Sequence, residues 1–294
     1  KEPLYDFGLH FAYLGSPENL WRNTNMKLKA LSAFGLCLAL VLPLFAHDLF
    51  LKPDSFFAKV NEKLSISVFN GTFQSSEGAV SFARLTNVAV VSPSGTRADA
   101  VEADFTKNET TAFLNLVPKE QGNYVVGLST MWRENQLPAE QFNEYLVLEG
   151  MPHVLEERKR DKELELDGRY RYSKYVKTIF QAGAKQTESY KTVLGYAVEM
   201  VPQQNPYKLK SGDAIEILCI KDGKPLAGQP VSVGRESAGK LIEGKGVTSD
   251  AKGIIKFKLD GPGKWYAKFI NMSKITDPKL NYESKWATLT FEIK

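Results

Sequence analysis

Histidine is scarce in this sequence, with 3 residues among 294. A Ser-His-acid or Cys-His catalytic arrangement needs a histidine beside the nucleophile. Only two histidines, His47 and His153, lie beyond residue 46, so few such arrangements can be formed. The chain also lacks a glycine-rich phosphate loop and a Cys-x-x-Cys pair. Glycosidase chemistry needs paired carboxylates, whereas Glu199 stands alone in the apolar run 196–201. We therefore expect no catalytic residues and no enzymatic activity.

Charge of one sign does not dominate, because the formal net charge is only +4. The densest charged run, 156–165, mixes both signs, which is typical of a solvated helix face. No cluster of Lys and Arg interleaved with exposed aromatic residues is present, so we expect no nucleic-acid partner.

Long hydrophobic runs are limited to one, at 30–45. This run is shorter than the roughly 20 apolar residues that a membrane-spanning helix needs. It follows the basic residues Lys27 and Lys29 and leads to the small residue Ala46, which is the pattern of a cleavable signal peptide. The run therefore predicts export, with no permanent membrane span after cleavage.

Cleavage of the signal peptide predicted at 26–46 would make His47 the new amino terminus. The mature protein is then expected in the bacterial periplasm or outside the cell. Residues 1–25 precede a credible start methionine, and we interpret them as an upstream extension produced by a mis-assigned start codon.

Cysteine is scarcer still than histidine, with 2 residues in the chain. Cys37 lies within the predicted signal peptide, which leaves Cys219 as the cysteine of the mature chain. An intramolecular disulfide is therefore excluded. Cys219 lies in the apolar run 214–220 and is predicted to be a small buried core residue.

The mature chain is predicted to be mainly β, with two immunoglobulin-like antiparallel β-sandwich domains and a short helical segment between them. Short alternating runs such as 64–70, which ends in the turn dipeptide Asn70-Gly71, indicate an N-terminal sandwich domain over 47–135. Strands and tight turns of similar spacing indicate a C-terminal sandwich domain over 205–294.

The segment 136–204 is predicted to connect the domains by helical and extended structure. Two short helices are expected on either side of 150–152, because a proline disfavours a helical residue before it. A strand is expected at 176–180. The aromatic and basic run 169–177 is interpreted as an interface strand whose Tyr rings are packed and whose Arg and Lys are solvated, or else as a ligand platform. Glu199 is expected to be buried, with a raised pKa or an Arg partner.

Several stretches of the sequence, taken in order, resemble one bacterial family. These stretches are 46–53 (AHDLFLKP), 144–150, 169–177 (RYRYSKYVK), 194–202 (LGYAVEMVP), 205–213, 222–228 (DGKPLAG), 248–253 (TSDAKG), 263–265 and 283–291 (ESKWATLTF). The chain resembles the domain-of-unknown-function 4198 family, periplasmic proteins often labelled as nickel-uptake transporter components. The resemblance implies an export signal, β-sandwich domains and metal handling. Relatives with the nickel label commonly contain further histidines, whereas 264–269 contains none here.

His47 is the candidate ligand that signal cleavage would create. Its free α-amino nitrogen and its ring Nδ1 could close a chelate on one metal ion, and nitrogen chelates favour Cu(II) or Ni(II) in tetragonal geometry. Asp48 adds a carboxylate, and His153 would supply a third nitrogen, as in a histidine brace. We therefore predict one transition-metal ion (nickel, cobalt or copper) at His47, Asp48 and His153, and no other cofactor.

His47 and His153 can also be explained without a metal. His47 can be the solvated start of the first strand, and His153, which follows Pro152, can be a surface residue at a helix start. The favoured function is an exported soluble metal-binding protein that supports metal uptake or homeostasis, with a membrane transporter or an envelope protein as partner. The alternative is a cell-envelope binding or scaffolding module of β-sandwich domains that holds no metal.

Overall fold

The computed structural model describes residues 47–294. The predicted upstream extension (1–25) and the predicted signal peptide (26–46) lie outside the described residues. The described residues, 47–294, belong to one compact unit. The N-terminal sandwich, the connecting segment and the C-terminal sandwich predicted from sequence all lie within it.

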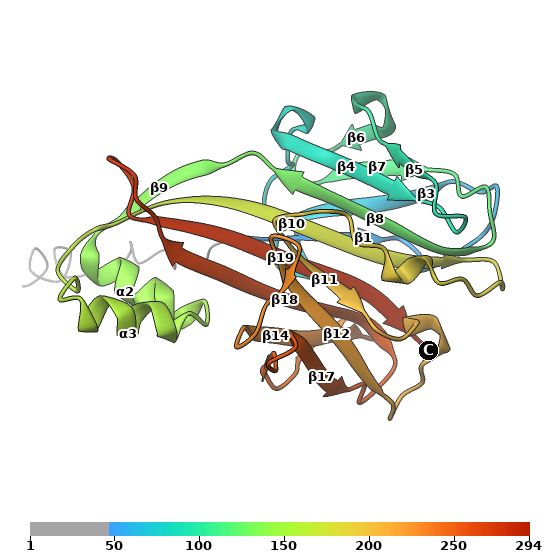
Figure 1. Cartoon of the computed structure of the whole chain (residues 1–294). Coiled ribbons are helices and arrows are strands. Elements are labelled where there is room, and N and C mark those ends of the chain that lie inside the picture. Colours follow the sequence, from blue (N-terminus) through green and yellow to red (C-terminus); the bar gives the residue numbers. More distant parts are fainter. Residues whose placement is uncertain (1–46) are drawn as a thin grey trace, which may run out of the picture. The chain divides into compact units, whose positions relative to one another are not determined.

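About half of the described residues are in β-strands (Figure 1). In the first half of the described chain the strands are β1 (Asp48–Pro53), β2 (Phe57–Ala58), β3 (Leu64–Gly71), β4 (Leu85–Val91), β5 (Arg97–Asp99), β6 (Phe105–Lys107), β7 (Ala112–Leu116), β8 (Gly122–Thr130) and β9 (Arg133–Leu137). After the helices α2 (Ala139–Leu148) and α3 (Pro152–Arg160), they are β10 (Gly168–Ala182), β11 (Val198–Pro202), β12 (Ala214–Lys221), β13 (Lys224–Pro225), β14 (Pro230–Ser237), β15 (Lys240–Glu243), β16 (Val247–Thr248), β17 (Ile254–Lys258), β18 (Gly263–Lys274) and β19 (Tyr282–Ile293).

These strands form a large central sheet and two smaller ones. The large sheet contains 11 strands, with the order β15-β14-β18-β19-β10-β8-β4-β5 and with β16, β2 and β9 paired beside that path. The first outer sheet has 4 strands in the order β1-β3-β7-β6, and the second, also of 4 strands, contains β11, β12, β13 and β17. The predicted alternation of β3 is confirmed, because Leu64, Ile66 and Val68 are buried while the serines between them are partly exposed.

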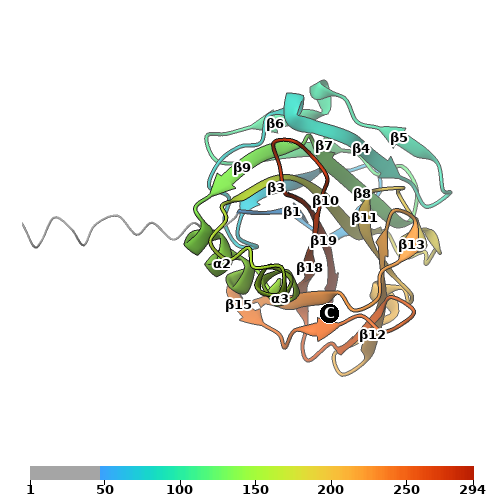
Figure 2. The same ribbon diagram turned by 60° about the vertical axis from the view of Figure 1, so that its left-hand side comes forward.

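The two outer sheets cover opposite faces of the large sheet. Successive side chains of a strand point to opposite faces. Val125 and Ile179 belong to the core shared with the second outer sheet, whereas their neighbours Val126 and Phe180 belong to the core shared with the first. Figure 2 shows the two outer sheets separated by β10, β18 and β19. The prediction of a mainly β chain built of antiparallel sandwich layers is confirmed.

Strand β10 joins the predicted domains. It pairs in parallel with β19, from Tyr170 opposite Tyr282 to Thr178 opposite Thr290, and antiparallel with β8. Strands from the predicted N-terminal domain, from the connecting segment and from the predicted C-terminal domain therefore share one continuous sheet.

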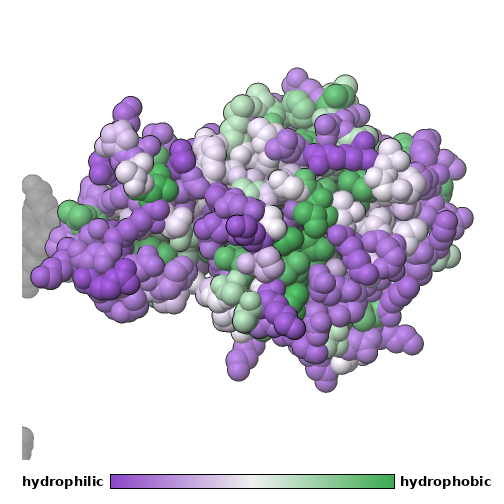
Figure 3. All heavy atoms as spheres, viewed as in Figure 1, coloured by the Kyte–Doolittle hydropathy of each residue, from purple (hydrophilic) through white to green (hydrophobic). Residues whose placement is uncertain are grey.

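The predicted pair of short helices is confirmed. α2 ends at Leu148 and α3 begins at Pro152, with Gly150 between them at a φ of +73°. The helices pack Phe142 and Leu146 against side chains of β10, β18 and β19 on the face that also carries β1. Their outer surface is strongly hydrophilic (Figure 3). Within the described residues no helix is long and apolar enough to span a membrane.

Candidate functional site

Strand β1 is the edge strand of the first outer sheet, and side chains of the large sheet hold it in place. On one side it pairs with β3, from Asp48 opposite Gly71 onward. The carbonyl oxygen of Leu49 accepts a hydrogen bond from Thr288 Oγ1 at 2.8 Å. In the same way Thr290 Oγ1 donates a hydrogen bond to the carbonyl oxygen of Leu51 at 2.6 Å. These bonds satisfy backbone acceptors of an edge strand that would otherwise need water.

His47 continues this row of carbonyl groups. Its carbonyl oxygen accepts a hydrogen bond from Lys174 Nζ, and its ring Nε2 contacts the carboxylate of Glu77. The side chain of His47 is 45% exposed. In a neutral imidazole one nitrogen carries the proton and the other carries the lone pair. In the neutral ring, a carboxylate at Nε2 favours the tautomer with its proton on Nε2 and its lone pair on Nδ1, the nitrogen nearer the backbone.

Asp48 is buried and is committed to an ion pair. Its Oδ2 atom pairs with Nζ of Lys268 on β18, and the side chains of the two residues are 11% and 29% exposed. Burial lowers the pKa of Lys268, but the Asp48 carboxylate outweighs this effect and the net pKa is raised. Asp48 therefore lies beside His47 with its charge already balanced.

Lys174 is buried beneath aromatic rings next to His47. Its Nζ lies 5.3 Å from the ring centroid of Trp286 and 5.9 Å from that of Tyr172. Burial lowers the pKa of Lys174 to about 8, and the Asp48 carboxylate opposes part of this shift. The prediction that the lysines of 169–177 are solvated is wrong for Lys174, because its ammonium finds a carbonyl acceptor and ring faces inside the protein.

His153 is an exposed residue in the first turn of α3. Across residues 47–294, no group of three or more His, Cys, Asp and Glu side chains is arranged to hold a metal ion. The structure thus places His47 and Asp48 together at the start of β1, beside Glu77, and does not gather His153 with them into such a group. The assignment of a metal to these residues stays a prediction.

Sequence reasoning missed Glu77, Lys174 and Lys268. Glu77 lies in the loop after β3, 30 residues from His47, and no local pattern indicates its contact. The turn predicted at Asn70-Gly71 is wrong, because both residues belong to β3 and pair with β1. Lys268 is 220 residues from Asp48. Lys174 alone carried a signal, because it is four residues from Tyr170 and alternation in a strand places both side chains on the same face.

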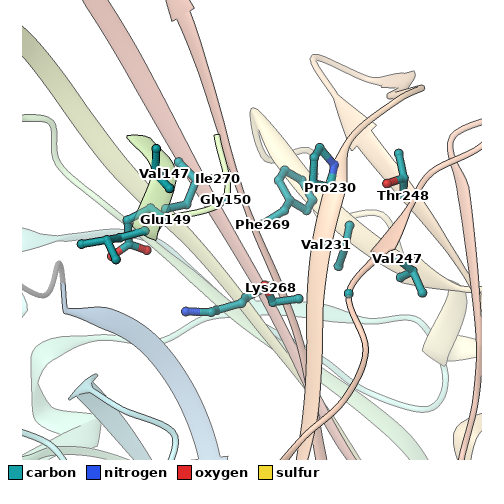
Figure 4. A pocket seen from close by; sticks show the side chains of 13 residues that line it. Val147, Glu149, Gly150, Pro230, Val231, Val247, Thr248, Lys268, Phe269 and Ile270 are labelled. Carbon is teal, nitrogen blue, oxygen red and sulfur yellow. The ribbon is translucent and has the colours of Figure 1, made fainter. Parts of the chain in front are cut away.

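A cleft of about 240 Å³ lies beside this site. The turn that ends α2 forms one wall, and β14, β16 and β18 form the others. Its lining residues are Val147, Leu148, Glu149, Gly150, Pro230, Val231, Ser232, Gly246, Val247, Thr248, Lys268, Phe269 and Ile270. Figure 4 shows Val147 and Glu149 on one side of the cleft, Val231 and Val247 on the other, and Lys268 between them. Lys268 thus belongs both to the cleft and to the ion pair with Asp48.

These features define a protein of two sandwich layers on one central sheet, with its first strand fixed beside a small cleft. The chain belongs to the family described as "Domain of unknown function (DUF4198)", whose profile matches residues 44–273. The predicted family membership is therefore confirmed. The matched residues include β1, both helices and nearly all of β18. A comparison with curated proteins gave no match.

Solved structures with partial similarity come from diverse proteins. The D0-D1 domain of intimin is 15% identical, with 83% of this chain and 97% of that chain covered, at a TM-score of 0.20. Native alpha-2-macroglobulin from Escherichia coli, spanning domains MG0-NIE-MG1, is 10% identical, with coverage of 83% and 95% and a TM-score of 0.20. A marsupial T cell receptor is 10% identical, with coverage of 82% and 73% and a TM-score of 0.19. Such low TM-scores carry no information about function.

Proposed function

We propose that the protein, once cleaved after Ala46, binds one transition-metal ion through the α-amino nitrogen and Nδ1 of His47. In this role it would support uptake or homeostasis of nickel, cobalt or copper in the cell envelope. The observation that carries the proposal is the contact between Nε2 of His47 and the Glu77 carboxylate. This contact directs the lone pair to Nδ1, the ring nitrogen that can chelate together with the α-amine.

A carboxylate behind a metal-binding histidine is a common arrangement in proteins. The carboxylate fixes the tautomer and the orientation of the ring and makes the ligand more basic. Glu77 comes from a different segment of the chain than His47, so the ring is held independently of the backbone that bears it.

The anchoring of β1 supports the same function. The carbonyl groups of His47, Leu49 and Leu51 are all held by side chains of the large sheet. The backbone that would carry the free amine is thereby fixed before a metal arrives, which lowers the entropy cost of binding.

The role proposed for Asp48 follows from its partner. Because Lys268 neutralises it, Asp48 acts as a fixed neighbour of the chelate, and coordination by its carboxylate would require Lys268 to move. His153 is not required for a chelate with two nitrogen donors.

The test is metal binding by the mature chain. Protein exported and cleaved so that it begins at His47 should bind close to one Cu(II) or Ni(II) per chain, measured by elemental analysis after desalting. His47→Ala should lose this metal, whereas His153→Ala, at an exposed helix position, should retain it. Full stoichiometry in His47→Ala would overturn the proposal. A mature wild-type chain that binds no metal would favour the alternative of an envelope binding or scaffolding module.

A further inference from the structure

The second outer sheet has an open edge at β17. Among the described strands, β17 pairs with β12 alone. Its hydrogen bonds to that side fall on alternate residues. Leu259 donates through its N–H to the residue that precedes β12, and the carbonyl of Gly253 accepts from β12, each at 2.8 Å. By this alternation the N–H and C=O groups of Lys256 and Lys258 point away from β12, toward the open edge.

A separate cleft of about 260 Å³, which we call the β17 cleft, opens beside this edge. It lies between β17 and the edge of the large sheet that β14, β15 and the loop after β15 form. Its apolar lining residues are Val233, Ile242, Val247, Phe257 and Trp265. Val233, Phe257 and Trp265 belong to one core, and Val247 packs against it, so the cleft enters the space between two layers of the sandwich. Its volume is below the roughly 300 Å³ of the smallest drug-sized pockets and suits a single apolar side chain.

The rim of the β17 cleft is basic. Its charged lining residues are Arg235, Lys245, Lys256, Lys258 and Asp260. Arg235 pairs with Asp260 at 2.8 Å, and Lys256 pairs with Glu216 at 2.9 Å. Within residues 47–294 neither Lys245 nor Lys258 has an ion-pair partner. The rim therefore carries two unbalanced positive charges, which favour a ligand with carboxylates.

The same lysines argue against a second copy of this chain as the occupant. Two β17 strands paired edge to edge would bring the lysines of one copy beside those of the other, and like charges across a strand pair are destabilising. Lysines on an edge strand commonly prevent such self-association. A strand with carboxylates opposite Lys256 and Lys258 would replace this repulsion by attraction.

We propose that the β17 edge binds an extended acidic segment of a partner protein as an added antiparallel strand. The backbone of the segment bonds to the N–H and C=O groups of Lys256 and Lys258. The side chains opposite these lysines are carboxylates that face outward, and the apolar side chain between them enters the β17 cleft against Phe257 and Trp265. In this mode the backbone bonds supply affinity and the cleft supplies specificity. The inference goes beyond the proposed metal chelate and does not depend on it.

The experiment uses the mature protein and a fluorescein-labelled peptide with the alternating sequence Glu-Val-Glu-Leu-Glu-Val-Glu, with binding followed by fluorescence anisotropy. Hydrogen-bonded antiparallel neighbours have side chains on the same face, so the backbone groups of the glutamates face β17. N-methylation of the glutamate amides should weaken binding about tenfold or more, because hydrogen bonds to β17 are lost. N-methylation of the Val and Leu amides should leave binding unchanged.

Two results with these peptides would overturn the inference. Equal binding of the two methylated peptides would show that no strand is added. Displacement of the peptide by octanoate at equal concentration would show that a carboxylate on an apolar tail is sufficient for the cleft.

Matched variants test the location of the peptide. Lys258→Glu reverses a charge at the edge and should weaken binding about tenfold or more. A peptide with Lys in place of Glu should bind Lys258→Glu better than it binds the wild type. Lys63→Glu, at an exposed lysine before β3, should bind the acidic peptide like the wild type. Unchanged binding in Lys258→Glu, or equal losses in both variants, would overturn the inference.

A second matched pair tests the cleft itself. Ile242→Asp places a carboxylate at the cleft, where it should weaken binding of the acidic peptide about tenfold or more. Val117→Asp is the control, because Val117 is 41% exposed against 37% for Ile242 and does not line the cleft. Circular dichroism of both variants should match the wild type, since both positions are exposed. Binding by Ile242→Asp equal to that of Val117→Asp would overturn the assignment of the apolar side chain to the cleft.

Discussion

The ammonium of Lys177 lies 2.5 Å from Oε2 of Glu199, and the two side chains are 2% and 1% exposed. The Glu199 carboxylate also accepts hydrogen bonds from the backbone N–H groups of Leu194, Gly195 and Tyr196. One carboxylate thus joins β10, β11 and the turn that precedes β11. The prediction that Glu199 pairs with an Arg is wrong, because its partner in the ion pair is Lys177.

Removing Lys177 from this pair should destabilise the protein strongly. Lys177→Met leaves the Glu199 charge buried without its counter-ion, and breaking a buried pair in this way costs about 3–5 kcal/mol. Urea unfolding of the mature chain measures the loss. Lys256→Met is the matched control, since Lys256 pairs with Glu216 at 2.9 Å with side chains 64% and 36% exposed. That exposed pair should contribute less than about 1 kcal/mol. Equal losses for the two variants would contradict the assignment.

Sequence patterns predicted the parts of the fold whose causes are local. The alternation of β3 and the break between α2 and α3 follow from residue types within a few positions of each other. The parallel pairing of β10 with β19 joins residues 112 positions apart, such as Arg171 and Glu283, and no local pattern encodes it. β10 is also longer than the strand predicted at 176–180, because charged residues that interrupt its apolar pattern pair with carboxylates of other strands.

The buried Cys219 should make stability depend on alkaline pH. Burial raises the pKa of its thiol to about 12, whereas an unfolded cysteine titrates near about 8.5. Below about pH 8.5 the thiol is neutral in both states, and above it the unfolded state releases a proton that the folded state keeps. Stability should therefore fall as pH rises toward 12, by about 1.4 kcal/mol per pH unit from this group.

Urea unfolding at pH 8 and pH 10 measures this effect. From pH 8 to pH 10 the wild type should lose about 2 kcal/mol more than Cys219→Ala, which lacks the thiol. At pH 8 a disulfide reagent should not label Cys219 until the protein unfolds. The same pH dependence in both proteins, or rapid labelling of the native chain, would show that the thiol is not buried as described.

Gly168 at the start of β10 is required by close packing. A Cβ atom at this position would lie 2.1 Å from Cγ of Phe142 on α2, which is fully buried and cannot move aside freely. Gly168→Ala should therefore cost about 1–3 kcal/mol. The melting temperature should fall by about 2–4 °C for each kcal/mol lost in a domain of this size.

Gly78→Ala is the control for this substitution, because a Cβ there has no neighbour within 4 Å. Its melting temperature should stay within about a degree or two of the wild type. If Gly168→Ala melted like Gly78→Ala, the helix pair would have to pack more loosely on β10 than the structure has it.

The residues around His47 mark the limit of sequence-based prediction for the site. His47 and Asp48 could be chosen as candidates because the signal sequence and the family resemblance both point to the mature amino terminus. Their partners Glu77, Lys174 and Lys268 come from three other segments, and they meet only because β1 crosses the central strands. Contacts of this kind depend on tertiary packing, and the local sequence pattern of each segment does not indicate them.

Glu77 should set the metal affinity of the mature chain without being a ligand itself. Glu77→Ala removes the carboxylate from Nε2 of His47, so the ring can rotate and its proton can move to Nδ1. The loss of such a supporting carboxylate typically lowers metal affinity about 10–100-fold. Glu77→Gln can still accept a hydrogen bond from Nε2–H through its side-chain oxygen, and it should recover part of the affinity. Competition titration with a chromogenic chelator measures both variants.

Stoichiometry and spectra separate this positioning role from direct coordination. In Glu77→Ala the binding of one Cu(II) per chain should persist at higher metal concentration, and the number of nitrogen donors in the electron paramagnetic resonance spectrum should not change. Glu109→Ala, at another exposed acidic position, should bind copper like the wild type. If Glu77→Ala altered the donor set while His47→Ala did not, the carboxylate would itself be the ligand, and the chelate at His47 would have to be abandoned.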